Sequence, residues 1–315
     1  MKVVFFGTPD FAVEPLKKII SGRHEVIAVV TQPDRPKGRS GKPVFSPVKE
    51  VAVSFGIPVL QYEKIRKEGV EDLKKLSADI FVTCAYGQIL SQEIIDIPPH
   101  GIINIHASLL PRYRGAAPIQ WSILSGDEET GVTIMRTEAG VDTGDVILQK
   151  SVKIGSDETA GELFGKLSSL GADLINEALD LIAEGKAEYI KQDESLATHV
   201  RMLRKEDGLI DWSLPAKRIY DLVRGMDPWP SAYTYYFGKT IKIWRVEIYR
   251  GEIKYAACGE IISSDRANGI VVKCSDGAIK ITELQLEGAK RMTADVFLLG
   301  RSFEVGARFG GEKPC

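Results

Sequence analysis

Three polar side chains interrupt an otherwise apolar run in the first half of the chain. Asn104, His106 and Ser108 alternate with isoleucines in a stretch, 102–108, that has the character of a buried strand. Side chains two residues apart share one face of a strand, so these three would project together at its carboxyl end. Burying such groups without partners costs free energy. We therefore expect a polar cleft in which they can bind a reacting group, although a structural Asn and His held by neighbouring loops fits the spacing equally well.

A second polar loop, Thr137 to Asp145, carries Asp142 between Gly140 and Gly144. The two glycines allow the backbone to turn sharply or to approach a ligand closely. An aspartate that lies beside a histidine fixes the tautomer of the ring. Taken alone, however, the loop is more simply interpreted as an Asp/Gly turn between two strands.

A third loop concentrates positive charge after a predicted strand. Arg35, Lys37, Arg39 and Lys42 lie close together among glycines and prolines. A cationic loop of this kind suits contact with the phosphate backbone of a nucleic acid. The alternative is a solvated charged loop, which is the usual outcome for a run of charge.

Apolar, β-branched runs alternate with amphipathic segments in the first 150 residues. They predict strands at 3–6, 26–31, 80–85 and 102–105, and helices at 10–21, 47–55 and 70–76. This alternation indicates an α/β fold with a doubly wound, mostly parallel, Rossmann-like sheet, which binds ligands at the carboxyl ends of its strands. The first strand-to-helix turn has only Gly7 of the G-x-G-x-x-G fingerprint, which argues against a nicotinamide cofactor.

The pattern changes in the second half of the chain. A long helix is predicted at 158–185, and a polar stretch follows it. Short strands with turn signals between them are then predicted at 232–237, 239–249, 260–263, 269–274 and 278–286. Such strands are typical of a small antiparallel β-barrel, with an OB-like fold as the leading interpretation. We expect a catalytic domain at 1–188, a linker at 189–206 and a C-terminal β-barrel domain at 207–315.

Composition limits the classes of function that remain. The 315 residues carry a formal net charge of −2, so any contact with nucleic acid must come from local patches. None of the four cysteines forms a CxxC pair, and no metal site is expected. No apolar run approaches the roughly 18 residues of a membrane span, and the first residues predict a strand rather than a signal peptide. We expect a cytoplasmic monomer without membrane contact.

Longer motifs resemble the folate-dependent formyltransferases, and the resemblance covers nearly the whole chain. One element resembles a pattern shared by all members of this family: Asn104-x-His106, followed by Ser108–Pro111 and by Asp142 downstream. It therefore indicates the reaction and does not indicate the acceptor. The basic loop, the run Gly115–Gln120 and the C-terminal half resemble the branch of the family that acts on methionyl-tRNA.

The resemblance implies a reaction for translation initiation. 10-Formyltetrahydrofolate would donate its formyl group to the amino group of methionine on initiator tRNA, without a metal or a nicotinamide. The catalytic set would be Asn104, His106 and Asp142. The folate would lie against Ser108, Leu109, Leu110 and Pro111, and the tRNA would contact Arg35, Lys37, Arg39, Lys42 and the C-terminal β-barrel.

Three other functions fit parts of the sequence. A folate-dependent formyltransferase for a nucleotide, an amino sugar or glycinamide ribonucleotide would keep the same three catalytic residues, but has less reason for a basic loop and a terminal barrel. A non-catalytic RNA-binding protein would have no reason to keep the three polar residues intact. An oxidoreductase is disfavoured by the missing glycine fingerprint.

Overall fold

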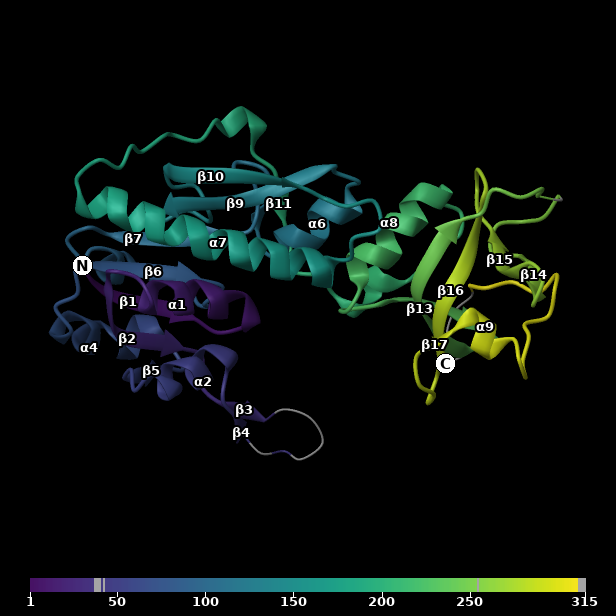
Figure 1. Ribbon diagram of the computed structural model, residues 1–315, viewed down its shortest axis with the longest axis horizontal. Coiled ribbons are helices and arrows are strands. Elements are labelled where there is room, and N and C mark those ends of the chain that lie inside the picture. Colours follow the sequence, from purple (N-terminus) through teal and green to yellow (C-terminus); the bar gives the residue numbers. More distant parts are fainter. Residues whose placement is uncertain (37–40, 42, 254, 311–315) are drawn as a thin grey trace. The chain divides into compact units, whose positions relative to one another are not determined.

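A computed structural model describes residues 1–36, 41, 43–253 and 255–310 of the chain (Figure 1). Contacts divide the chain into two units. The first unit contains Met1–Pro118, Glu129–Lys153 and Phe164–Val200, and the second contains Ile119–Glu128, Ile154–Leu163 and the chain from Arg201 on. The segment predicted as a linker, 189–206, is therefore divided between the two units at Val200.

The first unit is built on a seven-stranded sheet of order β10-β9-β7-β6-β1-β2-β5. Its strands are β1 (Lys2–Gly7), β2 (Glu25–Thr31), β5 (Val59–Gln61), β6 (Ile80–Cys84), β7 (Ile102–His106), β9 (Glu129–Arg136) and β10 (Val146–Lys153). The strands from β7 to β5 run parallel, while β9 and β10 run antiparallel to their neighbours. The strand order reverses between β1 and β6, and open α/β sheets bind ligands where this occurs. The predicted mostly parallel α/β sheet is confirmed.

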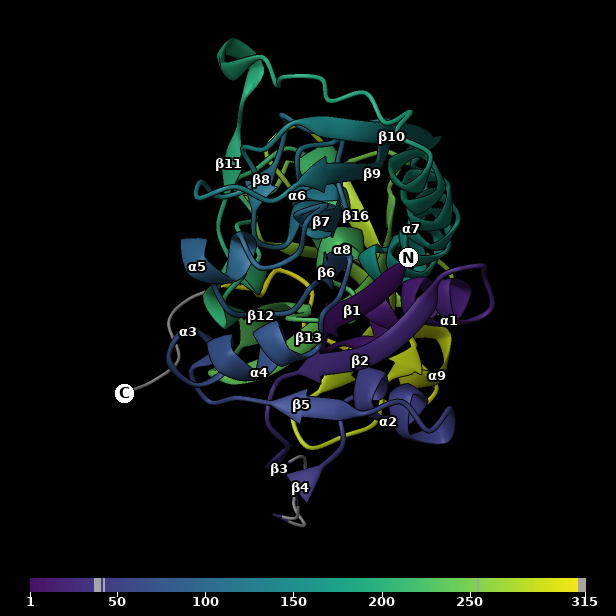
Figure 2. The same ribbon diagram turned by 90° about the vertical axis from the view of Figure 1, so that its left-hand side faces the viewer.

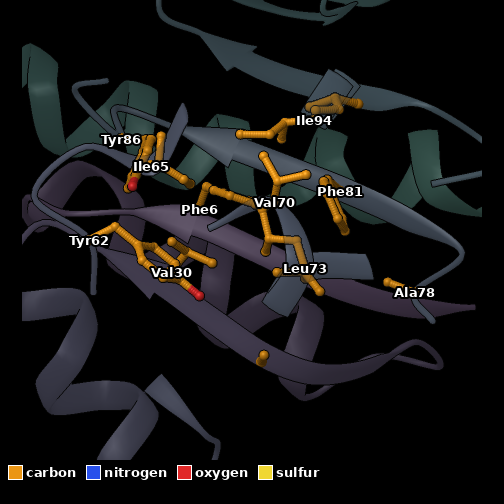
Figure 3. Close-up of a cluster of buried hydrophobic side chains, with 13 residues drawn as sticks. Phe6, Val30, Tyr62, Ile65, Val70, Leu73, Ala78, Phe81, Tyr86 and Ile94 are labelled. Atoms are coloured by element: carbon orange, nitrogen blue, oxygen red, sulfur yellow. The ribbon is translucent and has the colours of Figure 1, made fainter. Parts of the chain in front are cut away.

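Helices cover both faces of this sheet, which explains why β1 is almost continuously apolar. The helices of the first unit are α1 (Val13–Ile20), α2 (Pro47–Ser54), α3 (Ile65–Glu68), α4 (Val70–Lys75), α5 (Gln92–Ile95) and most of α7 (Ala160–Ala183), while α6 (Pro118–Leu124) belongs almost wholly to the second unit. On one face, Phe6 and Phe81 pack with Ile65, Leu73 and Ile94 of α3, α4 and α5 (Figure 3). Each such side chain contributes about 1.5–3 kcal/mol when it is fully buried.

The other face is covered in part by α7, which approaches the sheet closely at Gly171. A Cβ atom at this position would lie 2.9 Å from Cγ2 of Ile105 and 3.7 Å from Cγ1 of Val132. Phe164 of α7 packs edge to face with Phe11, which follows β1, and their ring centroids are 5.2 Å apart. The predicted long helix thus holds β7 and β9 from behind.

The second unit contains an antiparallel sheet of order β12-β13-β16-β15-β14, with β17 paired to β16. Its elements are α8 (Ala216–Met226), β12 (Ala232–Tyr236), β13 (Lys239–Ile248), β14 (Ile261–Asp265), β15 (Gly269–Lys273), β16 (Ala278–Leu286), β17 (Met292–Thr293) and α9 (Ala294–Phe297). The turn between β12 and β13 has positive φ at both Phe237 (44°) and Gly238 (74°), as a two-residue hairpin of type I′ requires. The predicted antiparallel character of this half is confirmed.

Short strands pair segments that lie far apart in the sequence. In the first unit, β8 (Arg114–Gly115) pairs in parallel with β11 (His199–Val200), and Figure 2 shows the two side by side. The pair β3 (Arg35–Pro36) and β4 (Pro43–Val44) flanks the basic loop. Short 3-10 helices span Asp10–Ala12 (η1), Glu194–Leu196 (η2) and Lys205–Gly208 (η3). Within the described residues, no helix combines the length and apolar character that crossing a membrane requires.

Candidate active site

Strand β7 carries Asn104 and His106 into the interior of the first unit. The strand lies between β6 and β9, and its Ile105 side chain faces α7 at Gly171. Because side chains alternate along a strand, Asn104 and His106 project together from the opposite face. His106 is 6% exposed, while Asn104 is half-buried and can still be reached by a ligand.

The amide of Asn104 is oriented by a neighbouring strand. Thr83 lies opposite Asn104 in the parallel register of β6 and β7, and its hydroxyl donates to Oδ1 of Asn104 at 2.8 Å. An asparagine amide has one acceptor oxygen and one donor nitrogen. Since the oxygen is engaged by Thr83, the nitrogen is the atom that Asn104 can offer as a donor.

The ring of His106 lies between a backbone carbonyl and a carboxylate. Nε2 is 3.0 Å from the carbonyl oxygen of Tyr113, so the ring donates to that oxygen. Nδ1 is 3.6 Å from Oδ2 of Asp142, which is longer than a hydrogen bond. The structure thus brings together the three residues Asn104, His106 and Asp142, and leaves Nδ1 as the ring nitrogen that a substrate can engage.

Asp142 has an unusual backbone conformation in its loop. Its φ angle is 53°, in the left-handed region that glycine favours. Its carboxylate oxygen Oδ2 accepts a hydrogen bond from the backbone amide of Gly115 at 2.8 Å. This bond aims the carboxylate toward His106 and ties the loop to β8.

The run Ser108–Pro111 forms a tightly tied turn after β7. The buried hydroxyl of Ser108 donates to the carbonyl of Arg112 at 2.7 Å, so it is used inside the turn. Thr133 donates to the carbonyl of Ser108 at 2.7 Å, and Gln149 donates to the carbonyl of Leu110 at 2.9 Å. Leu109 and Pro111 remain partly exposed as an apolar surface.

Of the four cations predicted to contact tRNA, the structure describes only Arg35. Lys37, Arg39 and Lys42 lie outside the described residues. The guanidinium of Arg35 is 2.5 Å from Glu63, and both side chains are largely exposed. Exposed pairs of this kind contribute about 0–1 kcal/mol, so Arg35 can exchange this partner for a phosphate at little cost.

A hollow of about 710 Å³ lies at the carboxyl edge of the sheet in the first unit. It is lined by Gln32, Glu63, Lys64, Arg66, Lys67, Gly87, Gln88 and Ile89, which follow β2, β5 and β6. Three cations against one carboxylate make this hollow suited to an anionic group. Gln32 and Gly87–Ile89 follow predicted strands, where ligand-binding loops are expected, whereas no local signal marks the side chains of Glu63 to Lys67.

A buried arginine close to the Asp142 loop was missed as well. The side chain of Arg114 is 1% exposed, and its guanidinium pairs with Glu194 through two hydrogen bonds of 2.7 and 2.8 Å. These bonds raise the pKa of Arg114 and lower the pKa of Glu194. Glu194 lies in the segment predicted as a linker, where nothing in the local sequence indicates a buried partner.

Among the described residues, no group of three or more His, Cys, Asp or Glu side chains could hold a metal ion.

Similarity to known proteins extends over nearly the whole chain. A formyl transferase family model matches residues 1–179, and a model of the C-terminal domain of formyl transferases matches residues 202–302. Proteins named methionyl-tRNA formyltransferase from Geobacter sulfurreducens and Agathobacter rectalis are each 50% identical to this chain. The matches cover 98% of this chain, and 97% and 99% of those two proteins.

Solved structures share the fold at much lower identity. An N-formyltransferase from Helicobacter canadensis, determined with folinic acid and dTDP-3-aminofucose, matches with a TM-score of 0.67 and 20% identity over 93% of this chain and all of that one. A glycinamide ribonucleotide transformylase from Symbiobacterium toebii matches with a TM-score of 0.52 and 21% identity over 61% of this chain and 94% of that one. With an amide, an imidazole and a carboxylate gathered at the end of β7, and with close relatives aligned from end to end, the chain belongs to the formyltransferase family, among the methionyl-tRNA formyltransferases.

Proposed function

We propose that this chain transfers the formyl group of 10-formyltetrahydrofolate to the amino group of methionine on initiator methionyl-tRNA. The observation that carries the proposal is the approach of Asp142 to within 3.6 Å of His106, beside an Asn104 amide whose nitrogen is left as a donor. The near-full-length identity to proteins named methionyl-tRNA formyltransferase supports the choice of acceptor.

The reaction needs a donor to the oxygen that becomes negatively charged. The neutral amine attacks the formyl carbon, and the former carbonyl oxygen carries the charge in the tetrahedral intermediate. Nδ2 of Asn104 donates a hydrogen bond to that oxygen, and Nδ1 of His106 donates a second one whenever that nitrogen carries a proton. Preorganised donors of this kind each contribute about 10²–10³ in rate.

Asp142 transfers the proton of the attacking amine to the leaving group. The amine nitrogen loses a proton as its bond to the formyl carbon forms, and N10 of the folate gains one as its bond to that carbon breaks. Asp142 accepts the first proton and passes it on, directly or through a water, so that charge balances at every step. The hydrogen bond from the amide of Gly115 keeps the carboxylate in place for this task.

The folate donor has two surfaces to occupy in the first unit. Leu109 and Pro111 of the turn after β7 offer an apolar contact for its ring system. The hollow lined by Lys64, Arg66 and Lys67 lies at the same carboxyl edge of the sheet and suits its carboxylates.

The tRNA is held by the basic loop and by the second unit. Arg35, Lys37, Arg39 and Lys42 reach phosphates, which fits a chain whose net charge of −2 provides no general attraction. The C-terminal β-barrel adds a few contacts, from residues among Lys242, Arg245, Lys273, Lys280, Lys290 and Arg291. The enzyme acts as a monomer in the cytoplasm, where initiator tRNA is charged and used.

The test is transfer of labelled formyl from 10-formyltetrahydrofolate, offered separately to initiator and elongator methionyl-tRNA over a series of salt concentrations. We expect a strong preference for the initiator and a steep loss of rate with salt, since each phosphate contact released costs affinity. Turnover of the folate without formylation of tRNA would move the acceptor to a small amine. No reaction with the folate at all would refute the proposed chemistry.

A further inference from the structure

Gln192, in the segment predicted as a linker, uses its whole side-chain amide at the Asp142 loop. Nε2 donates to the backbone carbonyl of Asp142 at 2.9 Å and to that of Gly144 at 2.7 Å. Oε1 accepts from Nε and Nη2 of Arg114 at 3.1 and 2.9 Å. Both donors and both acceptor positions of the amide are therefore occupied.

Arg114 determines which way this amide points. Its guanidinium has only donors to offer, so it can contact the oxygen of Gln192 and not the nitrogen. Glu194 holds the guanidinium from another direction with two hydrogen bonds. As Arg114 is buried and fixed, Gln192 has to present its nitrogen to the two carbonyls.

The loop needs support of this kind because of the conformation of Asp142. A φ angle of 53° brings the Cβ atom of an L-residue close to its own carbonyl, and the chain adopts it only where its surroundings impose it. The two carbonyls to which Gln192 donates belong to Asp142 itself and to Gly144, so these hydrogen bonds fix the backbone directly after the Cα atom of Asp142. On the other side, the carboxylate is held by the amide of Gly115, next to Arg114 in β8.

We infer that Gln192 is a positioning residue for formyl transfer. By donating hydrogen bonds to the carbonyls of Asp142 and Gly144, it keeps the carboxylate of Asp142 directed at His106. The inference rests on the proposed function, in which Asp142 handles the proton. Among the described residues, the side chain of Gln192 makes no hydrogen bond to Asn104 or His106.

Gln192→Met tests the inference, because methionine has nearly the same length and lacks both donors. Since a displacement of 1 Å in a reacting group costs about 10²-fold in rate, we expect kcat to fall about 10- to 100-fold. KM for the tRNA and the folate should stay within about threefold, as neither contact is removed. Gln92→Met is the matched control. The amide of Gln92 donates to Asp96 on the surface of α5, away from the residues placed in the site, and its loss should leave kcat unchanged.

A double-mutant cycle with Asp142→Asn separates positioning from a general loss of structure. If Gln192 acts through Asp142, adding Gln192→Met to Asp142→Asn should slow transfer by less than about threefold. An undiminished effect in the double variant would overturn the inference. If Gln192→Met fails to fold, Gln192→Glu keeps an oxygen for Arg114 and still lacks the donors, so it should show the same loss of kcat.

Hydrogen exchange gives a readout that does not depend on activity. Amides of the 138–146 loop and of Gly115 should exchange faster in Gln192→Met than in the wild type, while those of β1 should not change. Normal kcat in both Gln192 variants, with Asp142→Asn slow, would overturn this inference and leave the proposed function standing. Normal kcat in Asp142→Asn would instead refute the proposed role of Asp142.

Discussion

Gly144 lies so close to the end of β9 that no side chain fits there. A Cβ atom at this position would be 1.8 Å from the carbonyl oxygen of Arg136 and 2.8 Å from its carbonyl carbon. The contact is between two stretches of backbone that are also joined by a hydrogen bond of 2.8 Å from the amide of Arg136 to the carbonyl of Asp145. Neither partner can move out of the way as the end of a flexible side chain could.

The size of the displacement sets the size of the expected effect. Cβ atoms essentially never approach another heavy atom within 3.0 Å, so Gly144→Ala has to shift the loop by about 1.2 Å. A shift of that size in the neighbouring Asp142 carboxylate should lower kcat about 10²-fold, or about 2.7 kcal/mol in the activation barrier. Overpacking should also lower the free energy of unfolding by about 1–3 kcal/mol.

Single-turnover formylation with saturating folate and tRNA measures this effect without product release. Gly165→Ala is the matched control, because a Cβ atom at that position of α7 meets nothing within 4 Å. It should leave kcat unchanged and stabilise the helix by about 0.5–1 kcal/mol. A Gly144→Ala enzyme with the kcat of the wild type would refute the argument that the position of this loop limits the reaction.

Three further predictions concern the site and its surroundings. Asn104→Asp and His106→Ala should each slow transfer about 10²–10³-fold while circular dichroism and the melting temperature show a folded chain, and near-normal kcat in either would contradict the catalytic assignment. Arg39→Ala should raise KM for tRNA far more than KM for the folate, measured by varying each in turn; equal increases would speak against a dedicated tRNA loop. The pairing of Glu194 with Arg114 should stabilise the chain above the ordinary glutamate pKa of 4.5 and lose this effect as the pH falls through the lowered pKa of the folded state. The difference in Tm between the wild type and Glu194→Gln should therefore shrink in acid, and a constant difference down to about pH 3 would count against the pair.

Local patterns were sufficient to predict the sheet and to place two of the candidate site residues on one face of a strand. The alternation of polar and apolar residues around Asn104 and His106 places both on one face of β7 because strand periodicity is a local property. The approach of Asp142 to His106 depends on how a separate loop folds back, and no spacing within the sequence encodes that distance. It was expected only from the resemblance to a family.

The residues around the site that the sequence did not predict have one cause in common: their contacts depend on tertiary structure. Thr83 lies opposite Asn104 because of the register between two parallel strands, which the sequence of either strand alone does not specify. Gln192 and Glu194 lie 78 and 80 residues after Arg114, in a polar stretch that looks solvated. The stretch is polar because Gln192 and Glu194 bind the buried guanidinium of Arg114, and only the tertiary structure shows where that guanidinium lies.

The long separation between Arg114 and its partners has a consequence for synthesis of the chain. A ribosome that adds 5–20 residues per second delivers Glu194 roughly 4–16 seconds after Arg114. Until then the guanidinium has to remain in water, since burying an unpaired charge costs several kcal/mol. The nascent first unit can assemble its β1–β7 core early, but the Asp142 loop can close only when the segment leading into the second unit has been made. Assembly of the candidate site therefore has to wait until the growing chain has passed Glu194.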